Sequence, residues 1–255
     1  ISMLAGGCGV PQADPGQPAL AQMQGGDESL KEQINLKEIV AEALGDQTVI
    51  TLGFVKGSRL SDINESAISS VPKYDAQVTG APYRLEVTLQ GVEFWDFSGD
   101  NIWQNSRQVL GQFSQMPMGE EPYRIYFQLA DDADVTIQEQ DARLLLTVKN
   151  KSGEAQKEAY YVTVNAYEEY QEDSTLHDFG FSPTLCDGMG AVCLISGAFD
   201  TEQEAQAFLQ KADQELSEIL RGKEGYIQKL KTGELPEYDP KTELVAQSKV
   251  LQEAP

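Results

Sequence analysis

The chain has 255 residues, and 19 Lys and Arg against 41 Asp and Glu give it a formal net charge of −22. So acidic a chain repels phosphate backbones and anionic membrane surfaces, which argues against a nucleic-acid partner. His177 is the sole histidine, so a metal site made of several histidines is excluded, and any His-dependent catalytic site would have to use this residue. No run of 18 apolar residues is present, so we expect no transmembrane helix.

Residues 1–9 place small side chains directly before Cys8 and behind a short apolar run. This pattern resembles the lipobox of bacterial lipoproteins, with Ala5 standing where Leu is usual, and it implies that Cys8 is acylated. Pro, Gly and Gln dominate residues 9–28, a composition typical of a flexible tether. We therefore expect a periplasmic protein held by a lipid on a membrane, the outer one by preference; the alternative is a flexible tail with an accidental Cys.

The segment after the tether shows mixed patterns. A capping-box pattern at residues 29–32, apolar residues at helical spacing and a closing Gly45 predict a helix over 30–44. Residues 48–55 are rich in β-branched side chains and predict a strand. A short helix is expected over 61–70, before a proline.

From residue 81 to residue 150 the hydrophobic period changes to two. Apolar and polar side chains alternate over 83–90, 123–130 and 143–149, with turn residues between these stretches. Strands with one buried and one wet face are typical of an antiparallel sandwich or barrel.

Four stretches in this region, residues 109–113, 123–129, 135–137 and 143–148, resemble the AMIN domain. The resemblance covers about 70 residues, and Gln128 replaces an acidic residue common in that strand. It implies a small β-sandwich of the kind found in bacterial cell-wall amidases and in type IV pilus secretins. In those proteins the domain localises its host, and the resemblance implies that it does so by binding peptidoglycan.

Residues 160–166 alternate again and predict another strand, followed by an acidic connection over 168–178. An apolar stretch, 191–199, then leads into a second capping-box pattern at Thr201 and an apolar helical stripe that Gly222 closes. This order resembles half of a SPOR repeat, a ferredoxin-like peptidoglycan-binding module, without the helix of the other half.

We therefore expect an α+β chain, mainly an antiparallel β-sandwich followed by a small α+β module with one long amphipathic helix. The expected parts are a lipobox-like start and tether over 1–28, a helix-strand lead-in over 29–80, an AMIN-like domain over 81–150, a SPOR-like module over 151–225 and a charged tail over 226–255.

Cys186 and Cys193 flank an expected turn and could face each other on paired strands. In an oxidising periplasm they would close a disulfide, a bond worth roughly 2–4 kcal/mol. The alternative is two buried thiols. A metal site is poorly supported, because two thiolates lack two further ligands nearby.

Five residues of the AMIN-like region are candidate ligand contacts: Arg84, Trp95, Trp103, Arg107 and Arg124. Aromatic rings stack on sugars, and arginine donates to carboxylates such as those of peptidoglycan stem peptides. The alternative is that the tryptophans are core residues and the arginines form surface ion pairs.

These patterns together predict a non-enzymatic cell-envelope lipoprotein that binds peptidoglycan or localises a periplasmic machine, without a catalytic residue, metal or cofactor. One alternative is a structural subunit of a secretin, pilus or other surface assembly that acts through protein contacts. The other is a hydrolase that uses paired carboxylates, such as those in the acidic stretch 131–134.

Overall fold

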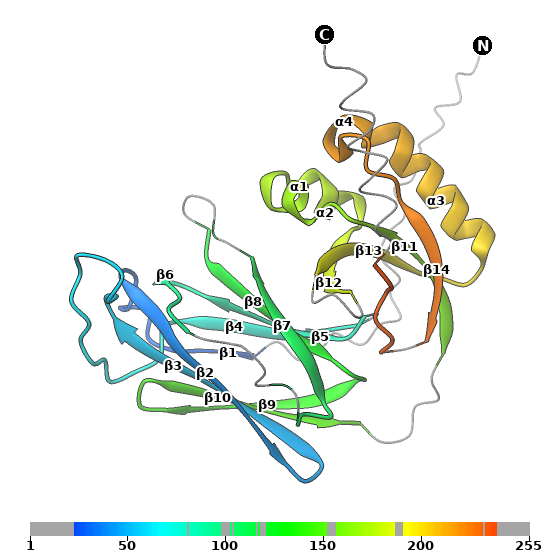
Figure 1. The fold of residues 1–255 in the computed structure, drawn as a ribbon. Coiled ribbons are helices and arrows are strands. Elements are labelled where there is room, and N and C mark those ends of the chain that lie inside the picture. The colour runs from blue at the N-terminus through cyan, green and yellow to red at the C-terminus, as the bar shows by residue number, and fades with distance from the viewer. Residues whose placement is uncertain are drawn as a thin grey trace, which may run out of the picture.

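The computed structural model describes residues 23–80, 82–97, 103, 105–115, 117, 121–151, 157–186, 191–231 and 233–238. Over these residues the chain forms three mainly antiparallel sheets and several helices, which is an α+β fold (Figure 1). Cys8, most of the expected tether and the end of the expected tail lie outside the described residues. No helix within these ranges is long and apolar enough to cross a membrane.

Two five-stranded sheets come first in the chain. The first sheet has the order β1-β4-β5-β8-β7, made of Met23–Gly25, Tyr74–Thr79, Arg84–Leu89, Tyr123–Leu129 and Val109–Gln115. The second sheet has the order β6-β2-β3-β10-β9, made of Val92–Phe94, Ile34–Leu44, Gln47–Lys56, Arg143–Asn150 and Ala133–Gln140. Neighbouring strands are antiparallel, except that β2 and β6 run parallel.

The two sheets enclose one hydrophobic core. Leu85 and Val87 of β5 are buried in it, whereas Glu86 between them points to the other side of the sheet. Leu52 of β3 and Leu146 of β10 fill the same core from the second sheet. The strand expected over 48–55 and the period-two strands expected over 83–90, 123–130 and 143–149 are therefore confirmed.

The helix expected over 30–44 is wrong, because these residues contain strand β2. A bulge between Leu36 and Glu38 shifts the pairing with β3, so Ile34, Leu36 and Ile39 all face the core. One extra residue thus turns a spacing of two into a spacing that resembles a helix. Gly45, with φ of 67°, sits in the two-residue turn of the β2–β3 hairpin instead of ending a helix.

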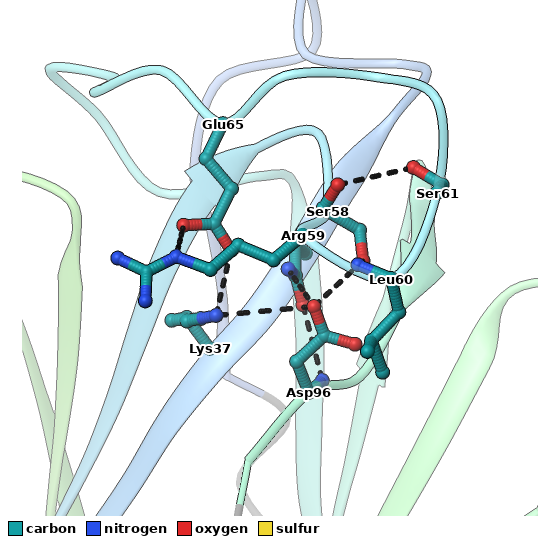
Figure 2. Close-up of polar contacts among 8 residues, drawn as sticks. Lys37, Ser58, Arg59, Leu60, Ser61, Glu65 and Asp96 are labelled. Atoms are coloured by element: carbon teal, nitrogen blue, oxygen red, sulfur yellow. Dashed lines mark hydrogen bonds and ion pairs between the residues drawn. The ribbon is translucent and has the colours of Figure 1, made fainter.

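The helix expected over 61–70 is also wrong, because this segment is a loop. The Ser61 hydroxyl donates to the backbone oxygen of Ser58 at 3.2 Å and accepts from the Ile63 N–H at 3.2 Å. Such local side-chain bonds compete with helix formation. The loop is fixed on β2 by Lys37, whose Nζ lies 2.6 Å from a Glu65 oxygen (Figure 2).

Two expected boundaries are corrected by the pairing of strands. Residues 23–25 of the expected tether form β1 and pair with β4, and strands β2, β3 and β4 of the expected lead-in belong to the two-sheet core. Residues 226–231 of the expected tail form β14, which pairs with β11. Both ends contribute backbone partners that the sheets would otherwise lack.

The C-terminal unit, residues 158–231, is built on the third sheet. Its order is β12-β13-β11-β14, made of Ser182–Leu185, Val192–Phe199, Glu158–Val164 and Tyr226–Lys231. The acidic connection, expected to lack helices, contains α1 and α2, Tyr167–Glu172 and Thr175–Phe179. The expected apolar stripe is divided between α3 and α4, Glu202–Glu215 and Ser217–Leu220, and the predicted capping box at Thr201 and Glu204 is confirmed.

Candidate cleft between the first sheet and the C-terminal unit

The C-terminal unit lies against the outer face of the first sheet, and a cleft of about 590 Å³ separates α1, α2 and β12 from strands β4, β5, β7 and β8. Strands β5 and β8 form the floor of the cleft. Their side chains alternate between the two faces of the sheet, so the residues between the core positions face outward into the cleft. Arg84 pairs with Gln128 in the register of these strands, and Thr88 pairs with Arg124. The two arginines therefore start about 13 Å apart along the cleft floor.

Aromatic packing attaches the C-terminal unit to the sheet. Phe113 of β7 and Tyr126 of β8 stack with ring centroids 4.8 Å apart, and Leu185 of β12 completes their buried cluster. Gly111 allows this approach, because a Cβ there would lie 2.6 Å from a Leu185 methyl group. The Tyr167 hydroxyl also donates to the backbone oxygen of Ser114 at 2.8 Å.

Gln128 is a second junction between the units. Its Oε1 accepts from the Thr184 hydroxyl at 2.9 Å, and its Nε2 donates to the backbone oxygen of Tyr83 at 3.0 Å. An amide suits this fully buried position because it donates and accepts at once, which a carboxylate cannot do. This explains why a neutral residue stands here.

Arg84 is a buried cation at the inner end of the cleft. Only 7% of its surface is exposed, and its Nη1 donates to the backbone oxygen of Pro183 in β12. Its Nε has no hydrogen-bond partner, and no carboxylate of the described residues lies within ion-pair distance of its guanidinium. Burial lowers the pKa of Arg84 from its ordinary value, although an arginine still stays charged at neutral pH.

Arg124 lies nearer the solvent, with 35% of its side chain exposed. Its Nε is 4.0 Å from a Glu86 oxygen, the outer limit of an ion pair, so this contact leaves its donors largely available. Burial raises the pKa of Tyr126, and burial raises the pKa of Tyr170 to about 12, so both phenols are neutral at physiological pH. His177 stands at the rim with 70% of its side chain exposed, 3.5 Å from Asp178.

The other candidate contacts lie elsewhere. Trp103 packs edge-on against Phe127 of the core, at a centroid distance of 5.7 Å. Trp95 stacks on Tyr123 at 5.2 Å and lines a separate hollow of about 760 Å³. Arg107 is exposed and lines neither the cleft nor that hollow. The structure thus brings Arg84 and Arg124 into one cleft but does not bring the tryptophans or Arg107 to it.

Cys186 and Cys193 are free, buried thiols in contact with each other. A hydrogen bond with Cys186, together with burial, raises the pKa of the Cys193 thiol. Their disulfide stays a prediction. In the described part of the chain, no group of three or more His, Cys, Asp or Glu side chains could hold a metal ion.

Sequence reasoning missed the tyrosines of the cleft. Tyr126 occupies an outward position of β8, where a strand with one wet face carries a polar residue. A large aromatic side chain at such a position was the available signal that another element covers this face. Tyr170 gave no such signal, because residues 168–178 were expected to form a connection and not the helix α1.

Neither the protein-family models nor the curated proteins contain a match to this chain.

Proposed function

We propose that this protein is a non-enzymatic binding protein of the bacterial cell envelope that holds peptidoglycan in its cleft. On this proposal the two-sheet part is an AMIN-like β-sandwich, the C-terminal unit is SPOR-like with α3 as its amphipathic helix, and Cys8 carries a lipid anchor facing the periplasm. The observation that carries the proposal is that Arg84 and Arg124 line the same cleft, on a chain of net charge −22.

The chemistry of the cleft suits a ligand with separate carboxylates and sugar or peptide surface. Arginine binds carboxylates through paired N–H donors, and neutral tyrosines add flat surface and hydroxyl donors. Glu86, Glu121, Glu172 and Asp173 line the same cleft and would repel a dense polyanion. Peptidoglycan stem peptides carry isolated carboxylates, which match two arginines spaced along a groove.

Co-sedimentation with purified sacculi tests this function. The full chain with Cys8→Ser avoids lipidation, and Arg124→Ala removes the solvent-accessible cation of the cleft. Arg143→Ala is the matched control, because Arg143 is an exposed arginine on β10 of the second sheet, 3.6 Å from Glu38. We expect Arg124→Ala to weaken pelleting by about tenfold, the effect of losing one charge-assisted contact of about 1.4 kcal/mol, while Arg143→Ala pellets as the parent does.

Absence of pelleting, or equal loss in both variants, would contradict wall binding. The first result would favour the alternative of a structural subunit in a secretin, pilus or other surface assembly, which cross-linking in intact cells would then examine.

A further inference from the structure

Arg84 forms no ion pair in the part of the chain that the structure describes, and Glu86 acts on its charge only from a longer distance. A cation removed from water loses hydration energy, and proteins normally restore it with a carboxylate or a full set of acceptors. Arg84 has one backbone acceptor, the Pro183 oxygen, and a buried Nε–H without a partner. The hydrogen bond to Pro183 alone does not require a charge, since a neutral donor would make it equally well.

Thr79 presents a second unmet polar group beside Arg84. The two residues are direct partners in the register of β4 and β5, which places their Cβ atoms about 5 Å apart. The Thr79 hydroxyl is buried and has no hydrogen-bond partner among the described residues. Both residues line the cleft. One end of the cleft thus combines a hydroxyl without a partner and a guanidinium whose Nε–H lacks an acceptor.

We propose that Arg84 and Thr79 form an anion subsite that takes one free carboxylate of the ligand, with Tyr126 and Tyr170 as its walls. This inference deepens the proposed binding function and rests on it. A carboxylate offers two oxygens, which match the guanidinium fork and leave a lone pair for the Thr79 hydroxyl. Glu86 lies two residues from Arg84 on β5 and lines the same cleft, so a dianion such as phosphate is repelled more than a single carboxylate is.

The ligand we assign is the C-terminal carboxylate of a peptidoglycan stem peptide. It is a single charge at the end of a short chain, so it can enter a narrow subsite while the rest of the peptide extends toward Arg124. The probe is therefore acetyl-D-alanyl-D-alanine, with its C-terminal amide as the uncharged control. Both are titrated calorimetrically into the full chain carrying Cys8→Ser.

We expect the acid to bind about tenfold or more tightly than the amide. Arg84→Met and Thr79→Val should remove this preference, while Thr136→Val, an exposed threonine of β9, should keep it. Arg84→Lys, which keeps the charge but lacks the fork, should bind the acid with intermediate affinity. Equal binding of acid and amide by the parent protein would overturn the subsite.

Thermal unfolding distinguishes a ligand contact from a structural residue. A buried cation without a carboxylate is costly to the free protein, so Arg84→Met should leave the Tm within about 3 °C of the parent value or raise it. A fall of about 10 °C or more, in Arg84→Met and in Arg84→Lys alike, would show that Arg84 holds the fold, and it would overturn the proposal.

The sacculus experiment separates this inference from the proposed function. Pelleting that Arg84→Met abolishes together with the acid preference supports both. Pelleting that Arg84→Met leaves unchanged overturns the subsite and leaves wall binding in place. Binding of the acid without pelleting of the parent protein supports an anion subsite but overturns wall binding, and with it the assignment of the ligand.

Discussion

The guanidinium of Arg84 donates a hydrogen bond to the backbone oxygen of Pro183, a residue 99 positions later in the chain. This contact joins β5 of the first sheet to β12 of the third, so the cleft exists only when the C-terminal unit is docked. The position of the unit and the geometry of the cleft are therefore coupled. Changes in the apolar docking cluster of Phe113, Tyr126 and Leu185 should affect stability and ligand binding together.

Phe113 is the centre of that docking cluster, stacked on Tyr126 and edge-on to Tyr167 at 6.2 Å. We expect Phe113→Ala to lower the free energy of unfolding by about 3 kcal/mol, the usual cost of deleting a buried ring. Leu110→Ala is the control on the same strand, because Leu110 is exposed and its loss should cost under about 0.5 kcal/mol. Urea unfolding measures both, and equal stability of the two variants would show that the interface contributes little.

The capping box of α3 gives a second prediction. The Thr201 hydroxyl accepts from the Glu204 N–H at 3.2 Å, and the Glu204 carboxylate accepts from the Thr201 N–H at 3.0 Å. Thr201→Ala should cost about 1 kcal/mol of stability in urea unfolding. Ser174→Ala is the matched control, because Ser174 precedes α2 without a side-chain capping bond. A Thr201 variant as stable as the Ser174 variant would mean that α3 does not depend on its cap.

The contacts of Asp96 predict that the stability of the fold depends on pH. Desolvation alone would raise the pKa of Asp96, but hydrogen bonds from Ser58 at 2.7 Å and Asn35 at 2.9 Å outweigh it and lower the pKa below its ordinary value (Figure 2). A carboxyl with a lowered folded pKa stabilises the fold above its unfolded pKa, and this contribution disappears as the pH falls through the folded pKa.

Asp96→Asn should therefore have a lower Tm than the parent at about pH 7, and the difference should shrink as the pH falls toward about 3. Asp62→Asn, a change at an exposed residue of the loop that carries Ser58, should show a small difference throughout. Thermal melts across this range make the comparison. A difference between Asp96→Asn and the parent that stays constant with pH would refute the assignment.

The two buried thiols give a prediction about oxidation. Thiolate, and not thiol, attacks in disulfide formation, and the pKa of Cys193 is raised by its hydrogen bond with Cys186 and by burial. We expect the folded protein to form the Cys186–Cys193 disulfide slowly with oxidised glutathione at neutral pH and faster when urea exposes the hairpin. Alkylation and mass spectrometry follow the loss of two thiols, and fast oxidation of the folded protein would contradict the buried arrangement.

Sequence periodicity predicted the strands whose period of two is unbroken, such as β5, β8 and β10. It failed at β2, where a bulge between Leu36 and Glu38 changes the spacing of the core residues. A bulge is fixed by pairing with β3, and the local pattern does not record it. The capping-box pattern at residues 29–32 reinforced the wrong prediction, because tertiary pairing overrides such local signals.

The site was predictable in part for a related reason. The alternation of β5 and β8 placed Arg84 and Arg124 on one outward face, and the structure has them there. The pattern gave no information on what covers that face, so it did not show that β12 buries Arg84. Only the docking of residues far along the chain turns this face into a cleft.

Side-chain NMR of arginine tests the central claim most directly. In ¹H–¹⁵N spectra of the full chain carrying Cys8→Ser, the Nε–H resonance of Arg84 is assigned with Arg84→Lys and followed during titration with acetyl-D-alanyl-D-alanine. We expect this resonance to move while that of Arg143 stays in place, because the unpartnered Nε–H of Arg84 gains a carboxylate acceptor. A peptide that binds without moving the Arg84 resonance, or that moves no arginine resonance at all, would contradict binding through the cleft.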